Sequence, residues 1–232
     1  MTTTDAMTLL TESIYQAWKE EDAYSVIFMD VAGAFNNVHH NRLLHNMKKR
    51  RIPAAIINIT RSFLTGRTMQ MCFNGTTTAT ISTPTGIPQG SRLSPILYMI
   101  YNADLLETTT ETPRLALGFI HDIAYGVVGT TTEENVKALK QTLEASETWK
   151  WRHGAQFEPS KYMLVLFTRK KVETHNPEVA IQIGDTTIHP MMEAKYRGVI
   201  FDQKLKFQAH LNHAIKKGTK FALEMANIVK CT

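Results

Sequence analysis

Residues 117–126 of this 232-residue chain read LGFIHDIAYG and place one polar pair, His121-Asp122, between two apolar flanks. Glycines bracket the stretch, and the β-branched and aromatic residues on both sides favour a buried strand–turn–strand. A charge that leaves water is costly unless it meets a partner or a metal. The stretch therefore predicts a hairpin whose tip carries an imidazole and a carboxylate that need such a partner.

A second carboxylate ends another predicted strand. Residues 24–29 form a continuous apolar run that is short enough for a buried strand, and Asp30 follows directly. A strand-end aspartate is often a turn or cap residue, and that interpretation stays open here. Alternatively, Asp30 and Asp122 lie on neighbouring strands as a carboxylate pair. Such a pair can hold two divalent ions about 4 Å apart for nucleotidyl transfer.

The rest of the chain interleaves helices and strands. Helical periodicity and end signals predict helices over residues 4–19, 39–51, 53–64, 93–106, 130–154 and 206–229, the last with a cap at Asp202. Apolar runs predict strands over residues 163–167, 179–183 and 196–201. Asn74-Gly75 predicts a two-residue turn joining residues 69–73 to 77–81. This mixed order predicts an α+β fold with a largely antiparallel sheet, not a doubly wound parallel one.

Composition sets broad limits on partners and location. Apolar residues make up 43% of the chain and charged residues 20%, which fits a folded globular protein, and the net charge of +5 tolerates a polyanionic partner. Cys72 and Cys231 form neither a disulfide framework nor a zinc knuckle, so we expect a reducing compartment. No membrane-spanning run and no signal peptide are expected, so the predicted location is intracellular.

The loop and helix over residues 83–106, TPTGIPQGSRLSPILYMIYNADLL, form the most specific stretch. Gly86 and Gly90 permit close backbone approach to a ligand, and the Gln89 amide between them can bond a base or sugar edge. An ordinary Pro/Gly connector would look similar.

Three basic clusters occur, at residues 48–51, at residues 169–171, and at Lys216, Lys217 and Lys220. They fit either solvated faces or phosphate contacts along a nucleic acid. His39 and His40 fit surface positions at a helix start, because no second pair offers zinc-ligand spacing.

Taken together, five stretches resemble the reverse transcriptases of non-LTR (LINE-like) retrotransposons, and most closely those of fungal elements. In order they are FMDVAGAFNNVHHNRLL, TGIPQGSRLSPILY, LGFIHDIAYG, GAQFEPSKYMLVLFTRK and KYRGVIFDQKLKFQAHL. They are similar to the first four palm motifs and to the segment that leads from the primer grip into the thumb. The resemblance covers essentially the whole chain. It implies a right-hand polymerase palm with partial fingers over residues 1–190, and the primer grip with the start of a truncated thumb over residues 191–232.

The resemblance also implies roles for individual residues. Asp30 and Asp122 would bind Mg²⁺ or Mn²⁺. Tyr196 and Gly198 would belong to the primer grip. Phe35 would be the steric gate that excludes a ribose 2′-hydroxyl. The remaining nucleotide and template contacts would come from Gln89, Gly90, Arg92 and Lys161. The implied partners are an RNA template, a DNA primer and deoxynucleoside triphosphates, in the nucleus, with no membrane and no indicated oligomeric state.

Departures from the family pattern weaken the expected activity. His121 stands where the family has its first metal-bridging aspartate, and a neutral imidazole is a poor Mg²⁺ ligand but an acceptable one for Mn²⁺. Asn36 replaces an aspartate and Arg197 replaces a leucine. The fingers strands upstream and part of the thumb are missing from this sequence. We therefore expect a fragment whose polymerase activity is reduced or lost.

Two alternatives remain at this point. The chain could be a non-catalytic, nucleic-acid-binding remnant of such a domain. It could also carry the His-Asp doublet of a metal-dependent phosphohydrolase, which would require residues 119–125 to be helical.

Overall fold

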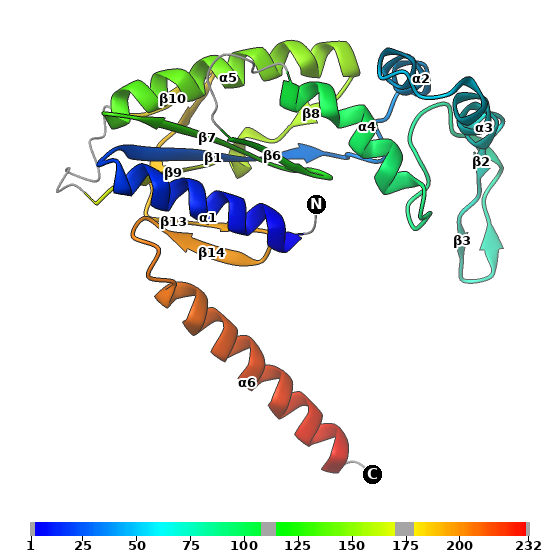
Figure 1. The fold of residues 1–232 in the computed structure, drawn as a ribbon. Helices are drawn as coiled ribbons and strands as arrows, with labels where there is room; N and C mark the ends of the chain where they lie inside the picture. The colour runs from blue at the N-terminus through cyan, green and yellow to red at the C-terminus, as the bar shows by residue number, and fades with distance from the viewer. Residues whose placement is uncertain (1–2, 108–114, 170–178, 231–232) are drawn as a thin grey trace.

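The structure is a computed structural model that describes residues 3–107, 115–169 and 179–230 (Figure 1). Its helices are α1 (Thr3–Lys19), α2 (His40–Lys49), α3 (Ala54–Leu64), α4 (Ser94–Glu107), α5 (Thr132–His153), the 3-10 turn η1 (Pro159–Lys161) and α6 (Gln208–Lys230). Its longer strands are β1 (Ala23–Ala32), β6 (Leu115–Phe119), β7 (Asp122–Gly129), β9 (Met163–Phe167), β13 (Glu193–Tyr196) and β14 (Val199–Asp202). Shorter strands are β2 (Thr68–Met69), β3 (Cys72–Phe73), β4 (Thr76–Thr77), β5 (Ile81–Ser82), β8 (Gln156–Phe157), β10 (Ile181–Ile183), β11 (Thr186–Ile188) and β12 (Pro190–Met191).

A six-stranded sheet in the order β12-β9-β1-β7-β6 forms the centre, with β8 paired to the end of β1. Strand β1 runs antiparallel to both β7 and β9, and only β12 is parallel to its neighbour β9. This arrangement confirms the predicted α+β fold with a largely antiparallel sheet. It also places β1, which carries Asp30 near its end, between β9 and β7.

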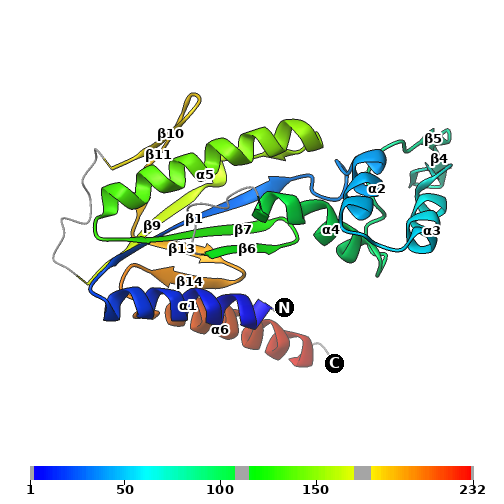
Figure 2. The same ribbon diagram turned by 45° about the horizontal axis from the view of Figure 1, so that its top comes forward.

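Both faces of the sheet are covered. Because successive strand residues point to opposite faces, Ile27 and Met29 belong to the core beneath α2, α4 and α5. Val26 and Phe28 belong to a second core against α1 and the β13–β14 hairpin. Figure 2 shows α5 on one side of the sheet and α1 with β14 on the other. This two-sided burial explains why β1 reads as a continuous apolar run.

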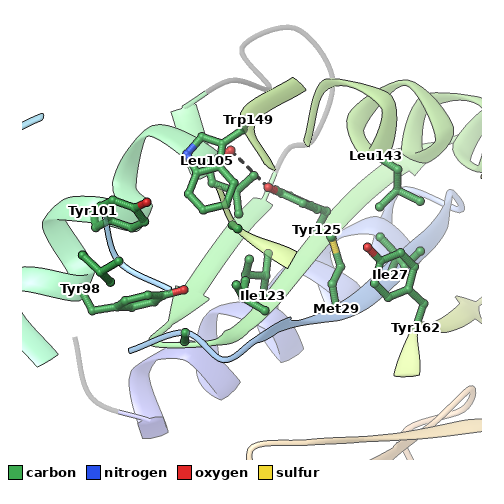
Figure 3. Close-up of a cluster of buried hydrophobic side chains, with 14 of the residues drawn as sticks. Ile27, Met29, Tyr98, Tyr101, Leu105, Ile123, Tyr125, Leu143, Trp149 and Tyr162 are labelled. Atoms are coloured by element: carbon green, nitrogen blue, oxygen red, sulfur yellow. Dashed lines mark hydrogen bonds between the residues drawn. The ribbon is translucent and has the colours of Figure 1, made fainter. Parts of the chain in front are cut away.

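Aromatic side chains join the larger core to the helices above it (Figure 3). Tyr125 on β7 is fully buried and donates a hydrogen bond to the Leu105 carbonyl of α4 at 3.2 Å. Tyr101 of α4 packs edge-on against Trp149 of α5, with ring centroids 6.2 Å apart. These contacts fix α4 and α5 on the sheet and hold β7 against β1.

Most predicted element ends are confirmed. The Thr131 side chain accepts a hydrogen bond from the Glu134 N–H at the start of α5, and Gly154 ends that helix in the left-handed conformation. Asn74 and Gly75 both have positive φ and join β3 to β4, as their sequence predicts. The strands predicted over residues 69–73 and 77–81 are each interrupted, and form the short pairs β2–β5 and β3–β4. Within the described residues, no helix combines the length and the apolar content needed to cross a bilayer.

Three expectations about the last third of the chain were wrong in detail. Residues 196–201 are not one strand, because Arg197 (φ 50°) and Gly198 (φ 90°) make a tight turn that splits them into the β13–β14 hairpin. The strand predicted from residue 179 begins at Ile181. Asp202 does not cap α6: its carboxylate accepts hydrogen bonds from three backbone N–H groups in the turn before the helix. The helix itself projects away from the sheet (Figure 1).

A buried histidine links α5 to α2. His153 is 3% exposed and stacks on Trp149 at 4.4 Å. Its Nδ1 lies 3.0 Å from the Trp149 carbonyl, which can only accept, so Nδ1 donates and Nε2 accepts from the Asn46 amide at 3.2 Å. Burial lowers the pKa of His153 to about 4. The folded protein therefore keeps this ring neutral.

This burial predicts acid destabilisation. Because the folded pKa lies below the unfolded value, the unfolded chain binds the proton more readily, and stability falls as pH drops from about 6.5 towards 4. Between pH 7 and pH 5 we expect His153 to account for a loss of about 2 kcal/mol in the free energy of unfolding. Urea denaturation at both pH values measures it. The His153→Gln variant should lack this loss, whereas His213→Gln, on the exposed surface of α6, should retain it; equal losses in all three proteins would contradict the assignment.

Candidate functional site

The register of the two central strands brings the predicted carboxylates together. Asp30 at the end of β1 lies directly opposite Asp122 at the start of β7. Successive side chains of a strand point to opposite faces of the sheet, so Asp30 shares the face of Phe28 and Asp122 shares the face of Ala124. Both aspartates therefore lie on the face covered by α1 and the β13–β14 hairpin. Two carboxylates opposite each other on one sheet face repel. The local structure must therefore supply positive charge.

His121 supplies the first partner from the hairpin tip. Residues 120 and 121 form the turn between β6 and β7, and Ile120 takes a positive φ of 57°. The Nδ1 atom of His121 lies 3.0 Å from Asp30 Oδ1 and 3.5 Å from Asp122 Oδ1. Hydrogen bonding to Asp122 and the charges of both carboxylates raise the pKa of His121, against the opposing effect of burial. The imidazole thus bridges the two aspartates.

Two further cations bind the outer oxygens of the pair. Arg197 Nη1 lies 2.6 Å from Asp122 Oδ2, and Lys161 Nζ lies 3.4 Å from Asp30 Oδ2. Burial alone would raise the pKa of the Asp122 carboxyl, but hydrogen bonds from His121 and Arg197 outweigh it and hold that pKa below its usual range. The Asp122 carboxylate is therefore ionised, and each of the two aspartates lies within ion-pair distance of cationic side chains.

The same three residues could hold a metal ion. One donor atom each from Asp30, His121 and Asp122 lies within 4.8 Å of the others. Imidazole and carboxylate together suit Mn²⁺ or Zn²⁺ better than Mg²⁺, which prefers oxygen ligands. The donor set supports one divalent ion. It does not match a pair of ions, because His121 adds no negative charge to that of the two carboxylates.

A cavity of about 660 Å³ opens beside the aspartates and collects most of the predicted nucleotide-binding residues. Its lining includes Asp30, Phe35, Gln89, Gly90, His121 and Lys161. The Phe35 ring is packed edge-on against Tyr98 at 5.5 Å, and the Gln89 amide donates to the Asn36 side chain at 3.0 Å. The structure thus places side chains from four separate motifs around one space.

Backbone hydrogen bonds lock the two loops that form this cavity. The Gly86 N–H donates to the Val38 carbonyl and the Ile87 N–H to the Phe35 carbonyl, each at 2.8 Å. A Cβ atom on Gly86 would lie 2.9 Å from the Asn36 carbonyl, so only glycine permits this approach. Glycine is therefore required at position 86 because this loop contacts another motif about 50 residues earlier in the chain.

A second cavity of about 430 Å³ also borders the aspartates, and its lining includes Asp30, Asp122, Lys161 and Tyr196. Tyr196 is buried and its ring packs against Phe28 at 5.0 Å. Two predicted site residues are not in either cavity. Arg92 is exposed, and Gly198 lies in the β13–β14 turn.

Other expectations have mixed outcomes. Residues 119–125 form a strand–turn–strand and not a helix, so the phosphohydrolase alternative was wrong. His39 is exposed as predicted, whereas His40 is partly buried, with Nε2 2.7 Å from the Gly86 carbonyl. Lys216, Lys217 and Lys220 are exposed on α6. Of the cluster at residues 169–171, positions 170 and 171 lie outside the described residues.

Two residues of the site were not predicted from the sequence. Arg197 was noted only as a departure from the family pattern, and Glu158, which lies 2.7 Å from Lys161 Nζ and lines the larger cavity, was not noted at all. Glu158 carried no local signal. The Arg197-Gly198 pair offered one weak signal, a glycine next to a polar residue, which is typical of a tight turn.

Comparison with known proteins places the chain. The family model for reverse transcriptase (RNA-dependent DNA polymerase) matches residues 2–201. The probable RNA-directed DNA polymerase from transposon BS of Drosophila melanogaster is 28% identical over 214 residues, covering 90% of this chain and 23% of that protein. The RNA-directed DNA polymerase from mobile element jockey of Drosophila funebris is 27% identical over 201 residues, covering 84% and 21%.

The chain spans about a quarter of the length of these curated relatives. Both come from insect elements, so the expected closeness to fungal elements stays a prediction. Among solved structures, apo telomerase from Candida tropicalis, truncated from its C-terminal domain, superposes with a TM-score of 0.59 at 15% identity, covering 90% of this chain and 39% of that one. This likeness shows the shared fold. With the family model matching most of its length, the chain belongs to the reverse transcriptase (RNA-dependent DNA polymerase) family.

Proposed function

We propose that the chain is the palm of a retrotransposon RNA-directed DNA polymerase whose nucleotidyl-transfer activity is impaired by His121. One observation carries the proposal: Asp30 and Asp122 lie opposite each other on adjacent strands with His121 bridging them. A carboxylate pair in this position suits metal-assisted phosphoryl chemistry, and the imidazole weakens the charge that such chemistry needs. The proposed partners are an RNA template, a DNA primer and deoxynucleoside triphosphates, and the proposed location is the nucleus.

The proposed metal is one divalent ion held by Asp30, His121 and Asp122. Mg²⁺ is the ion that the family resemblance implies, and the imidazole shifts the preference of this donor set towards Mn²⁺. When bound, such an ion polarises a phosphoryl oxygen and favours ionisation of an attacking hydroxyl. A second ion would require a further carboxylate at position 121.

The surrounding side chains then have definite tasks. Phe35, fixed against Tyr98, would exclude a sugar that carries a 2′-hydroxyl. Gln89, held by Asn36, would contact the template or the nucleotide at the mouth of the larger cavity. Lys161 extends from η1 into both cavities, where its ammonium can bind the departing pyrophosphate. Tyr196 would position the primer end from the smaller cavity.

His121→Asp tests the proposed impairment. Restoring a carboxylate between Asp30 and Asp122 adds the negative charge that a second ion needs, so Mg²⁺-dependent primer extension on an RNA template should rise about 10²-fold. Incorporation of radiolabelled deoxynucleotide, measured on the protein at its full natural length in Mg²⁺ and in Mn²⁺, reports the change. The unaltered protein should be more active in Mn²⁺ than in Mg²⁺.

The matched control is the double variant Asp30→Asn/His121→Asp, which should be inactive with either ion. Strong Mg²⁺-driven extension by the unaltered protein would disprove the impairment. An unchanged rate in His121→Asp would disprove the assignment of the site.

A second candidate function is nucleic-acid binding without chemistry. It is favoured by the ion pairs at the site, because both carboxylates already have cationic partners. It is also favoured by the exposed lysines of α6, which projects from the sheet and could follow a phosphate backbone. This function would keep the fold and the basic surface and would need no metal.

Replacing Lys216, Lys217 and Lys220 together by Gln tests the basic surface. If all three contact phosphates, single-stranded RNA affinity should fall and the slope of log K against log salt should become shallower by about 2. Fluorescence anisotropy measures both quantities over a salt range of about 50 to 200 mM, in which phosphate contacts weaken strongly. Lys137→Gln, which removes one positive charge at an exposed position on α5, is the control for charge loss away from α6 and should change neither. An unchanged slope in the triple variant would show that α6 does not contact RNA.

A further inference from the structure

Arg197 joins two segments that carry the site. It lies in the tight turn between β13 and β14, and its guanidinium reaches Asp122 at the start of β7 with an Nη1–Oδ2 distance of 2.6 Å. The same guanidinium lies over the Phe119 ring of β6, 4.0 Å from its centroid. The contacts hold the cation on both sides of the hairpin tip. A side chain fixed in this way loses little further freedom when it pairs with a carboxylate.

The position of Arg197 matters because Asp122 Oδ2 is one of the oxygens that a metal ion would need. Asp122 has two carboxylate oxygens: Oδ1 faces His121 at 3.5 Å, and Oδ2 is bound by Arg197. An incoming divalent ion would meet a fixed positive charge at the second oxygen. Because Arg is charged at any physiological pH, this repulsion is permanent.

Arg197 is also less exposed to solvent than Lys161, the cation that pairs with Asp30. Its side chain is 21% exposed, whereas that of Lys161 is 54% exposed and is shared with Glu158 at 2.7 Å. Solvent screens exposed ion pairs strongly and partly buried pairs much less. Of these two ion pairs, the one between Arg197 and Asp122 therefore dominates the charge balance.

We propose that Arg197 is a resident cation that replaces the charge of a metal ion at Asp122. The site then stays folded without a metal ion, because its carboxylates are ion-paired. It also binds divalent ions weakly. The proposal rests on the proposed function, because it concerns the same aspartates. It also connects two departures of this chain: His121 removes a negative charge from the metal site, and Arg197 adds a positive one. The β13–β14 hairpin is thereby fastened to the β6–β7 hairpin by an ion pair at the place where the proposed metal ion would bind.

Mn²⁺ binding to the protein, without nucleotide or nucleic acid, tests the proposal. Electron paramagnetic resonance titration of free Mn²⁺ should show weak binding to the unaltered protein and about tenfold tighter binding to Arg197→Leu, which keeps an apolar contact with Phe119 but removes the charge. Arg197→Gln should behave like Arg197→Leu and guards against a folding failure of one variant. Arg197→Lys, which keeps the charge, should bind as weakly as the unaltered protein.

Thermal unfolding supplies the second readout. EDTA should not change the melting temperature of the unaltered protein, whereas Arg197→Leu should melt at a lower temperature in EDTA and recover in Mn²⁺. Lys204→Leu, at an exposed position just after the end of β14, controls for loss of one positive charge and should show neither change.

The outcomes separate this inference from the proposed function. Equal Mn²⁺ affinities for the unaltered protein and both neutral variants would overturn the role of Arg197 and leave the polymerase proposal standing. If Mn²⁺ still binds tightly to Arg197→Leu/Asp30→Asn, the ion lies elsewhere, and the metal site of the proposed function is wrong as well. Tight Mn²⁺ binding by the unaltered protein would overturn the inference.

Discussion

Asp30 and Asp122 lie opposite each other on two antiparallel strands, and the whole site depends on this placement. Two ionised carboxylates opposite each other on one sheet face repel, and a folded chain tolerates them only with compensating charge. Here His121, Arg197 and Lys161 provide that charge from the hairpin tip, from the β13–β14 turn and from η1. Three segments that are distant in sequence are thereby tied to one pair of oxygen-bearing side chains.

The strand register that creates this pair is itself fixed by burial on both faces of the sheet. A shift of one residue would turn every side chain of β1 to the opposite face. Both cores then would lose their fit, because Ile27 and Met29 pack beneath α5 while Val26 and Phe28 pack against α1 and the β13–β14 hairpin. The Tyr125 hydrogen bond to α4 adds a direction-specific contact to this packing. The apolar interior therefore positions the polar site, and the site contributes ion pairs that hold the surface hairpin in place.

The chain belongs to the reverse transcriptase family, and its two central aspartates are surrounded by cationic side chains. The fold has a cavity lined in part by Phe35 and a glycine-dependent contact between two motif loops. The carboxylate pair is present as well, but its surroundings carry more positive charge than a two-ion site can accommodate. The chain therefore combines the fold of its family with an aspartate pair that is held by ion pairs.

The sequence by itself determined the local features, because their signals lie within a few residues. The hairpin at residues 117–126, the Asn74-Gly75 turn, and the Thr131 and Gly154 ends of α5 all follow from backbone preferences and short-range hydrogen bonds. The alternative of an ordinary cap role for Asp30 could not be settled in this way. The partner of Asp30 is Asp122, on a strand about 90 residues later in the chain, and only the pairing of β1 with β7 brings the two together. Tertiary structure alone decided the contact between Arg197 and Asp122, which are 75 residues apart. A side chain of opposite charge can find many partners along a chain, and packing of the β13–β14 hairpin against the sheet selects this one.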